Sequence, residues 1–202
     1  MTSSDPVELI EKLFAAEGES EYLGEAVTQA AHMLQAAGLA EQAGACDALI
    51  AAALLHDVGH FTGAVSGNEL MAGTDNHHGD TGADWLARWF GPDVTEPVRL
   101  HVAAKRYLCA VEPGYAAELS PASVYTLGVQ GGPMNTEEQE RFAESPYADA
   151  ACRLRRWDDA AKDPAGTTPE FARYRELLAG LARRARSDQA GSAQAGSERA
   201  GG

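Results

Sequence analysis

The residues best suited to chemistry in this chain lie in one short segment, His56-Asp57-Val58-Gly59-His60. The segment ends an apolar run from Ala48 to Leu55, which predicts a helix that is buried on most sides. A carboxylate at the end of a buried helix costs free energy unless a metal ion or another charge compensates it. Further side chains of the same chemistry lie elsewhere in the chain and could converge on this segment; they are His32, His77, His78, His101 and Asp158.

Imidazole and carboxylate groups indicate the kind of metal that such a site would bind. They suit iron, manganese, zinc or cobalt better than copper(I) or an iron–sulfur cluster. The three cysteines do not have the spacing of a structural zinc site. If four of these histidines and two aspartates take part, they are more ligands than one tetrahedral ion needs. They then predict a dinuclear site in which Asp57 bridges two metal ions about 3.5–4 Å apart. The spacing leaves open whether His77 or His78, and Asp158 or Asp159, takes part.

A second group of polar residues precedes the first of these histidines. Tyr22, Glu25, Gln29 and His32 are three, four and three residues apart, and we expect them on one face of a helix over residues 21–37. A solvated helix face would also explain the carboxylate and the amide. A phenol, a carboxylate, an amide and an imidazole on one face are nevertheless suited to line a site beside a metal.

Lys105 follows His101 by four residues, so both side chains are expected on the same face of one helix. A lysine beside a metal-binding histidine is suited to bind a phosphate or phosphonate group, although Lys105 taken alone is as well explained as a surface residue. The formal net charge is −14 at pH 7. Any anion site must therefore provide its own local positive charge.

Helical periodicity and helix-capping residues recur along the chain and nothing predicts a strand ladder, so we expect an all-α fold in a single domain. Residues 1–6 are expected to be flexible, residues 7–186 to form the domain, and the Gly-, Ala- and Ser-rich residues 187–202 to be disordered. A glycine-rich loop over residues 61–76 is expected to close over the site. The predicted helices span residues 7–16, 21–37, 41–58, 80–90, 95–109, 120–127, 137–143, 146–162 and 169–186.

The composition also limits the partners and the location of the protein. The negative charge argues against nucleic acid and anionic membranes as partners, because both bind basic surfaces. No apolar stretch has the length of a transmembrane helix, and the N-terminus has no secretory signal. The three cysteines are odd in number and far apart, as expected for free thiols. These features together predict a cytoplasmic protein and make no prediction of its oligomeric state.

Several further segments combine with these residues into a recognisable pattern. The histidines and aspartates follow the order H…HD…H…H…D. The other segments run from Tyr22 to Gln29, His56 to His60, His78 to Ala83, His101 to Leu108, Leu119 to Ser123, Gln130 to Met134 and Arg156 to Lys162. Together they resemble the HD-domain superfamily of helical metalloproteins and, within it, the mixed-valent diiron oxygenases of phosphonate breakdown. The resemblance covers residues 7–180.

The resemblance implies a single HD-domain helical bundle with two iron ions, as a mixed-valent Fe(II)/Fe(III) pair. It also implies that His78 rather than His77, and Asp158 rather than Asp159, is a ligand. Asp57 would bridge the two ions. The complete set of implied ligands is His32, His56, Asp57 and Asp158 for one iron, and His78, His101 and Asp57 for the other.

The resemblance further implies a substrate pocket beside the metals. The reaction would use dioxygen to cleave the C–P bond of the small organophosphonate (R)-2-amino-1-hydroxyethylphosphonate, giving glycine and phosphate. Lys105 would bind the phosphonate, Tyr22 and Glu25 would bind the amino end of the substrate, and these two residues and His60 would take part in catalysis. The implied substrate-binding residues are Tyr22, Glu25, Gln29, His60, Lys105, Ser123 and Thr126.

Three alternative functions are compatible with parts of this pattern. The same chemistry on the trimethylammonio analogue would give glycine betaine, but a quaternary ammonium prefers an aromatic cage, whereas Glu25 favours a primary amine. An HD-type metal-dependent phosphohydrolase would use its metals to activate water instead of dioxygen. A non-enzymatic binding protein would leave the clustering of so many reactive side chains unexplained.

Overall fold

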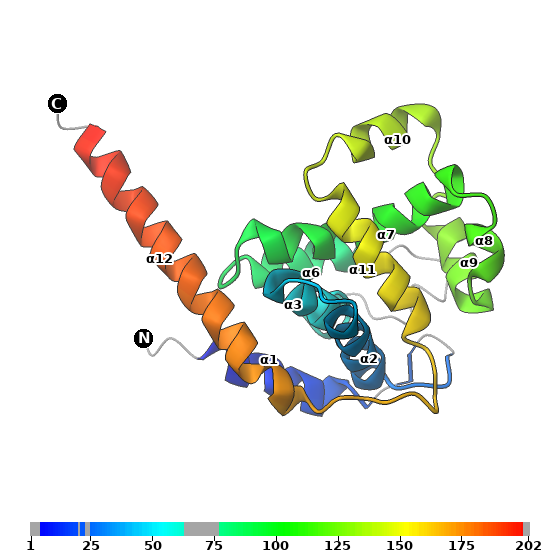
Figure 1. Cartoon of the computed structure of the whole chain (residues 1–202), viewed down its shortest axis with the longest axis horizontal. Coiled ribbons are helices and arrows are strands. Elements are labelled where there is room, and N and C mark those ends of the chain that lie inside the picture. Colours follow the sequence, from blue (N-terminus) through cyan, green and yellow to red (C-terminus); the bar gives the residue numbers. More distant parts are fainter. Residues whose placement is uncertain (1–4, 20, 23–24, 63–76, 200–202) are drawn as a thin grey trace.

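The computed structural model describes residues 5–19, 21–22, 25–62 and 77–199, with side chains up to residue 191. These residues form helices and no strand, apart from an isolated β-bridge between Glu21 and Thr28, which confirms the predicted all-α fold (Figure 1). Within the described ranges, no helix combines the length and the apolar character needed to cross a membrane. The helices are α1 (Pro6–Glu17), α2 (Gln29–Gln42), α3 (Asp47–Leu55), α4 (Gly59–Thr62), α6 (His78–Leu86), α7 (Pro92–Val111), α8 (Tyr115–Glu118), α9 (Pro121–Val129), α10 (Thr136–Ala143), α11 (Ala148–Ala160), the 3-10 helix η1 (Phe171–Tyr174) and α12 (Arg175–Arg199).

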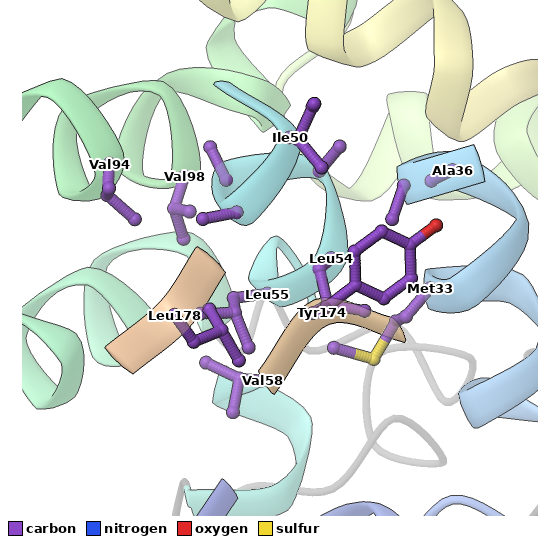
Figure 2. Close-up of a cluster of buried hydrophobic side chains, with 14 of the residues drawn as sticks. Met33, Ala36, Ile50, Leu54, Leu55, Val58, Val94, Val98, Tyr174 and Leu178 are labelled. Atoms are coloured by element: carbon purple, nitrogen blue, oxygen red, sulfur yellow. The ribbon is translucent and has the colours of Figure 1, made fainter. Parts of the chain in front are cut away.

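The core of the fold is built around α3. The helix is apolar on every side, and all of its residues from Leu49 to Leu55 are buried. Figure 2 shows Met33 of α2, Val98 of α7, Tyr174 of η1 and Leu178 of α12 in the cluster of buried side chains that includes α3. Because α3 is enclosed, the polar residues that directly follow it begin inside the protein.

Helices α7 and α11 pack along each other and form the second part of the core. A smaller apolar cluster joins Ala104 of α7, Phe142 of α10 and Ala151 of α11. Helix α6 packs on α7, and α4 packs on α6. This packing brings α3, α6, α7 and α11 toward one region, although they are far apart in the sequence.

The second predicted helix is wrong at both ends. It begins at Gln29 and not at residue 21, because the Thr28 side chain caps it by accepting from Ala31 N at 3.1 Å. Tyr22 and Glu25 therefore lie in the preceding segment and share no helix face with Gln29, so the periodicity argument that grouped them fails. The helix also continues through Gly38 to Gln42. Gly38 fits closely against Pro169, because an added Cβ would lie 3.0 Å from Pro169 Cγ.

The predicted helix over residues 41–58 is also wrong, because the chain breaks it into separate pieces. Residues 41–42 end α2, and Gly44 then adopts φ 66°, a left-handed conformation that ends regular helix. After α3, the chain turns at residues 56–58 before the short helix α4. This turn allows His56 and Asp57 to face into the bundle.

The other predicted helices correspond to helices in the structure with ends that differ by a few residues, except the last, over residues 169–186, which is a 3-10 helix followed by the longer α12. Side chains cap two of these helices: Ser120 accepts from Ser123 N at 3.1 Å, and Asn135 forms a capping box with Glu138. The short helix α8 was not among the predicted helices. Helix α7 begins at Pro92, so Pro97 lies beyond its first turn.

The two ends of the chain differ from the predicted flexible segments. Pro6 is buried at the start of α1, where Asp5 caps the helix, while residues 1–4 lie outside the described range. Helix α12 continues to Arg199, whereas we predicted disorder from residue 187. The alanine, glutamine and arginine residues there favour extension of a helix that has already begun. This end of α12 extends away from the other helices (Figure 1). Residues 61 and 62, where a loop was predicted to begin, belong to α4, and residues 63–76 lie outside the described range.

The contact between α4 and α6 gives a stability prediction. In Gly59→Ala, the added Cβ would lie 2.0 Å from the backbone oxygen of His78 and 3.0 Å from Gly82 N. Both are backbone atoms, so the helices must separate, and we expect a loss of about 1–3 kcal/mol in the free energy of unfolding, measured by urea denaturation. Gly128→Ala is the control, because its Cβ would meet no atom within 4 Å. A Gly59→Ala variant as stable as the wild type would show that this contact does not constrain the fold.

Candidate active site

The six side chains that we predicted as metal ligands lie together, although they come from five helical elements. His32 belongs to α2, His56 and Asp57 follow α3, and the other three belong to α6, α7 and α11. None of the six residues is more than 5% exposed. We call this set the ligand cluster; its members are His32, His56, Asp57, His78, His101 and Asp158.

Backbone carbonyls set the tautomers of three of the histidines. The Nδ1 atoms of His32, His56 and His101 lie 2.9, 2.8 and 2.6 Å from the carbonyl oxygens of Ala161, Ala53 and Val98. A carbonyl oxygen can only accept, so each Nδ1 carries a proton, and in the neutral imidazole the Nε2 presents a lone pair. These Nε2 atoms are the ones that point into the ligand cluster.

The first group of the cluster places four ligand atoms together. His32 Nε2 and His56 Nε2 are 3.0 Å apart. Because both of their protons are on Nδ1, this contact sets two lone pairs against each other and is not a hydrogen bond. Asp57 Oδ2 lies 3.8 and 3.5 Å from these two nitrogens, and Asp158 Oδ1 lies 3.3 and 3.8 Å from them. Neither carboxylate oxygen has a hydrogen-bond partner among the described residues.

The second group uses the other oxygen of Asp57. Asp57 Oδ1 lies 3.3 Å from His78 Nε2 and 3.5 Å from His101 Nε2. The two imidazole nitrogens are 3.0 Å apart. Asp57 therefore presents one oxygen to each group, as a bridging carboxylate does.

The protonation of these residues suits metal binding. Burial lowers the pKa of His56 to about 4 and that of His78 to about 3, so both imidazoles are neutral at pH 7. Burial alone would raise the pKa of Asp57, but the positive charge that His56 carries once it is protonated at low pH holds it well below its usual value, so the carboxylate is ionised at pH 7. Buried acceptor atoms that face one another without donors are stabilised when a cation lies between them. The ligand cluster can thus hold two metal ions.

The structure also distinguishes His78 from His77 and Asp158 from Asp159, two choices that the spacing in the sequence left open. His77 is exposed and has φ 46°, whereas His78 is buried in the ligand cluster. Asp158 reaches the cluster, whereas Asp159 accepts hydrogen bonds from Arg155 and from the Tyr115 hydroxyl.

A pocket lies beside the cluster. Its empty volume is about 400 Å³, which includes space that is open to solvent. Two aromatic contacts form part of its wall. The ring of Tyr22 stacks on His32 with centroids 3.8 Å apart, and His60 stacks on His78 at 4.2 Å. Burial and the charge of Asp57 raise the pKa of Tyr22 well above its usual value, so its phenol keeps its proton. Of the pocket residues expected from the sequence, the pocket is lined by Tyr22, Glu25, His60, Lys105, Ser123 and Thr126.

Gln29 is the exception. It is 8% exposed at the start of α2, and it is not among the described residues that line the pocket. That Gln29 binds the substrate was implied by the resemblance and stays a prediction.

One wall of the pocket is positively charged. Lys105, only 2% exposed, donates from Nζ to Thr126 Oγ1 at 2.9 Å. Lys162 Nζ donates to Ser123 Oγ at 2.8 Å, and the buried Arg155 also lines the pocket. We missed Arg155 and Lys162 in the sequence. Their spacing, three residues before and four residues after Asp158, was a usable signal within the predicted helix over residues 146–162, although α11 ends at Ala160 and Lys162 lies beyond it.

Glu25 lies where the pocket meets α9. Its Oε1 accepts from Ser120 Oγ at 2.5 Å and lies 3.9 Å from Lys162 Nζ. The backbone N–H of Glu25 donates to the carbonyl of Tyr22 at 2.7 Å, and this hydrogen bond holds the two residues close together at the site.

Comparison with known proteins relates this site to a chemistry. The profile of the HD domain matches residues 30–157. A protein of Leisingera caerulea named [1-hydroxy-2-(trimethylamino)ethyl]phosphonate dioxygenase (glycine-betaine-forming) is 42% identical over 172 residues, which cover 85% of this chain and 88% of the relative. The hydroxymethylphosphonate dioxygenase of Gimesia maris is 44% identical over 177 residues, which cover 85% of this chain and 87% of the relative. This chain belongs to the HD-domain phosphonate dioxygenases.

A third relative, the uncharacterized protein L432 of Acanthamoeba polyphaga mimivirus, is 35% identical over 175 residues, which cover 85% of this chain and 80% of the relative. The two named HD-domain phosphonate dioxygenases carry the names of different substrates. Membership of the family therefore leaves the substrate of this chain to be argued from its pocket.

The bridging position of Asp57 gives a prediction for metal binding. Asp57→Asn keeps the shape of the side chain and removes the charge shared by both groups of ligands. We expect the purified variant to lose metal from both groups and to lose activity by more than about a hundredfold. Metal content by mass spectrometry and turnover measure the two effects. Asp84→Asn, an exposed acid on α6, is the control. An Asp57→Asn variant with full metal content would contradict the bridging role.

The charge of Lys105 gives a prediction of pH dependence. Burial lowers the pKa of Lys105 to about 7, and repulsion from Arg155 adds to this effect. A bound anion favours the protonated lysine, so binding takes up a proton and is strongest below pH 7. We expect the affinity for sulfate, whose charge is constant in this range, to fall between pH 7 and pH 9 by up to about tenfold per pH unit.

Calorimetric titration at constant ionic strength measures this affinity. Lys105→Met should bind sulfate more weakly and without this pH dependence. A wild-type affinity that stays constant from pH 7 to pH 9 would show that Lys105 does not titrate in this range.

Proposed function

We propose that this chain is a diiron oxygenase that cleaves the C–P bond of (R)-2-amino-1-hydroxyethylphosphonate with dioxygen and forms glycine and phosphate. The observation that carries the proposal is that a cluster suited to two metal ions shares one pocket with a buried cationic wall. Phosphonate dioxygenases at 42% and 44% identity support the same reaction class.

The proposed metal is iron, which suits the ligand cluster because the cluster combines imidazoles with carboxylates and contains no thiolate. The bound Fe(II)/Fe(III) pair would supply dioxygen activation and accept electrons from the substrate. We assign His32, His56 and Asp158 to one iron and His78 and His101 to the other, with Asp57 shared between them.

The cationic wall would hold the phosphonate. Lys105 and Thr126 already form a hydrogen-bonded pair, and a phosphonate oxygen can accept from both side chains. Ser123 is held by Lys162 on the same side. Because Lys105 is buried, its attraction for a dianion is screened less than on the surface. This arrangement would place C1 of the substrate toward the ligand cluster.

Glu25 and Tyr22 would bind the amino end of the substrate. A primary ammonium donates three hydrogen bonds, and a carboxylate is a strong acceptor for them. Tyr22 keeps its phenolic proton and can donate to the substrate. Burial lowers the pKa of His60, so at pH 7 its imidazole is a neutral base that can accept the proton of the C1 hydroxyl.

A second candidate substrate is the trimethylammonio analogue, which would give glycine betaine. The relative named for this substrate at 42% identity favours it. A quaternary ammonium donates no hydrogen bond and is bound best by several aromatic faces. Among the described residues that line the pocket, Tyr22 provides the single phenyl-type ring and Glu25 the carboxylate near it. This composition favours the primary amine.

Oxygen consumption with product analysis tests the proposal. Iron-loaded, ascorbate-treated protein should consume one dioxygen per substrate and release glycine and phosphate in equal amounts, which balances the atoms of the reaction. The same assay is run with the trimethylammonio analogue and with hydroxymethylphosphonate. Phosphate release that does not require oxygen would indicate a phosphohydrolase. Preferred turnover of the trimethylammonio analogue would replace the proposed substrate and keep the reaction class.

A matched pair of variants completes this test at the amino end. Glu25→Gln should lower kcat/KM for the primary amine by about 10–100-fold, as expected for losing a hydrogen bond to a charged group. Glu21→Gln removes the same charge from an exposed neighbour and should leave kcat/KM unchanged. Equal activity of both variants would remove Glu25 from the binding site.

A further inference from the structure

The adjacent carboxylates of α11, Asp158 and Asp159, face different surroundings. Asp158 is 1% exposed and belongs to the ligand cluster, whereas Asp159 is half-buried and accepts a hydrogen bond from the hydroxyl of Tyr115 at the start of α8. Arg155 lies one turn earlier on α11 and is hydrogen-bonded to both aspartates. The proposed function gives no role to Asp159 or to Tyr115.

The hydrogen bonds of Arg155 are divided unequally between the two aspartates. Its Nε lies 3.1 Å from Asp159 Oδ2, and its Nη2 donates to Asp159 Oδ1, so one edge of the guanidinium binds Asp159 with two hydrogen bonds. Only Nη1 reaches Asp158, at 2.6 Å from Oδ2. Asp158 Oδ1 is left without a hydrogen bond, 3.3 Å from His32 Nε2.

This division matters because a guanidinium and a carboxylate tend to pair through two parallel hydrogen bonds. Arg155 is 4% exposed, so it needs carboxylate partners inside the protein. Without Asp159, it would be free to turn and to bind both oxygens of Asp158. Oδ1 of Asp158 would then be drawn away from the ligand cluster.

We propose that Asp159, held by the Tyr115 hydroxyl, is a positioning residue that makes Arg155 bind Asp158 through one oxygen and so keeps the other oxygen for the metal. This inference rests on the metal centre assigned in the proposed function. The chain of contacts runs from Tyr115 through Asp159 and Arg155 to Asp158. Residues that do not touch the metal thereby set the geometry of one ligand.

Metal affinity tests this inference without relying on turnover. The metal-free full chain is titrated with cobalt(II), and binding is followed by visible absorption and calorimetry. The wild type should bind two ions. In Asp159→Asn, we expect one of the two binding steps to weaken by about 10–100-fold, the usual effect of losing a residue that orients a ligand, and the other step to change less. Tyr115→Phe should weaken the same step by a smaller factor.

Two further variants separate this role from a general loss of structure. Asp159→Glu keeps the carboxylate and should recover part of the affinity lost in Asp159→Asn. Asp149→Asn removes an exposed charge from the same helix and should bind cobalt(II) like the wild type. Circular dichroism and thermal unfolding show whether each variant is folded. If Asp159→Asn does not fold, Tyr115→Phe and Asp159→Glu still test the inference.

Two results would overturn the inference. One is a folded Asp159→Asn variant that binds both ions with wild-type affinity, and the other is an equal weakening of both binding steps. A wild-type protein that binds two ions but converts no phosphonate would instead contradict the proposed function alone. The two failures are therefore distinguishable.

Discussion

The structure depends on how one buried charge, the carboxylate of Asp57, is compensated. Asp57 is 2% exposed, and imidazoles from three different helical elements and from the end of α3 surround it. Those imidazoles present lone pairs where ordinary packing would require donors. Such an arrangement is favourable around cations, so metal binding and the packing of α2, α3, α6, α7 and α11 are coupled. The apolar core around α3 keeps this polar cluster away from water.

The histidine tautomers are set partly by local hydrogen bonds and partly by hydrogen bonds between segments that are distant in the sequence. His56 and His101 each donate from Nδ1 to the carbonyl three residues earlier, so the turn that carries each histidine also orients it. His32 donates to Ala161 beyond the end of α11, and Gln35 on the same helix donates to Asp163 O at 2.8 Å. Two hydrogen bonds thus join the segment after α11 to α2. They hold the end of α11, which carries Asp158, opposite His32.

The pocket provides local positive charge for an anion in a protein that is acidic overall. The chain carries a formal net charge of −14, yet Lys105, Arg155 and Lys162 converge on one wall beside the ligand cluster. Arg155 is partly neutralised by Asp158 and Asp159, whereas Lys105 has a hydroxyl as its hydrogen-bond partner. The distribution of charge over a few buried side chains, and not the overall balance, makes an organophosphonate a suitable ligand.

The sequence by itself determined the all-α class, the metal-ligating residue types and the likeness to phosphonate oxygenases, because apolar periodicity and the order of histidines and aspartates are local properties of a chain. It misplaced the start of α2, since the Thr28 cap and the bridge to Glu21 outweighed a helical spacing. Tertiary structure alone decided that Asp57 offers one oxygen to each group of ligands and that Arg155 divides its hydrogen bonds between Asp158 and Asp159. These features depend on distances between helices that are remote in the sequence, and no local pattern encodes such distances.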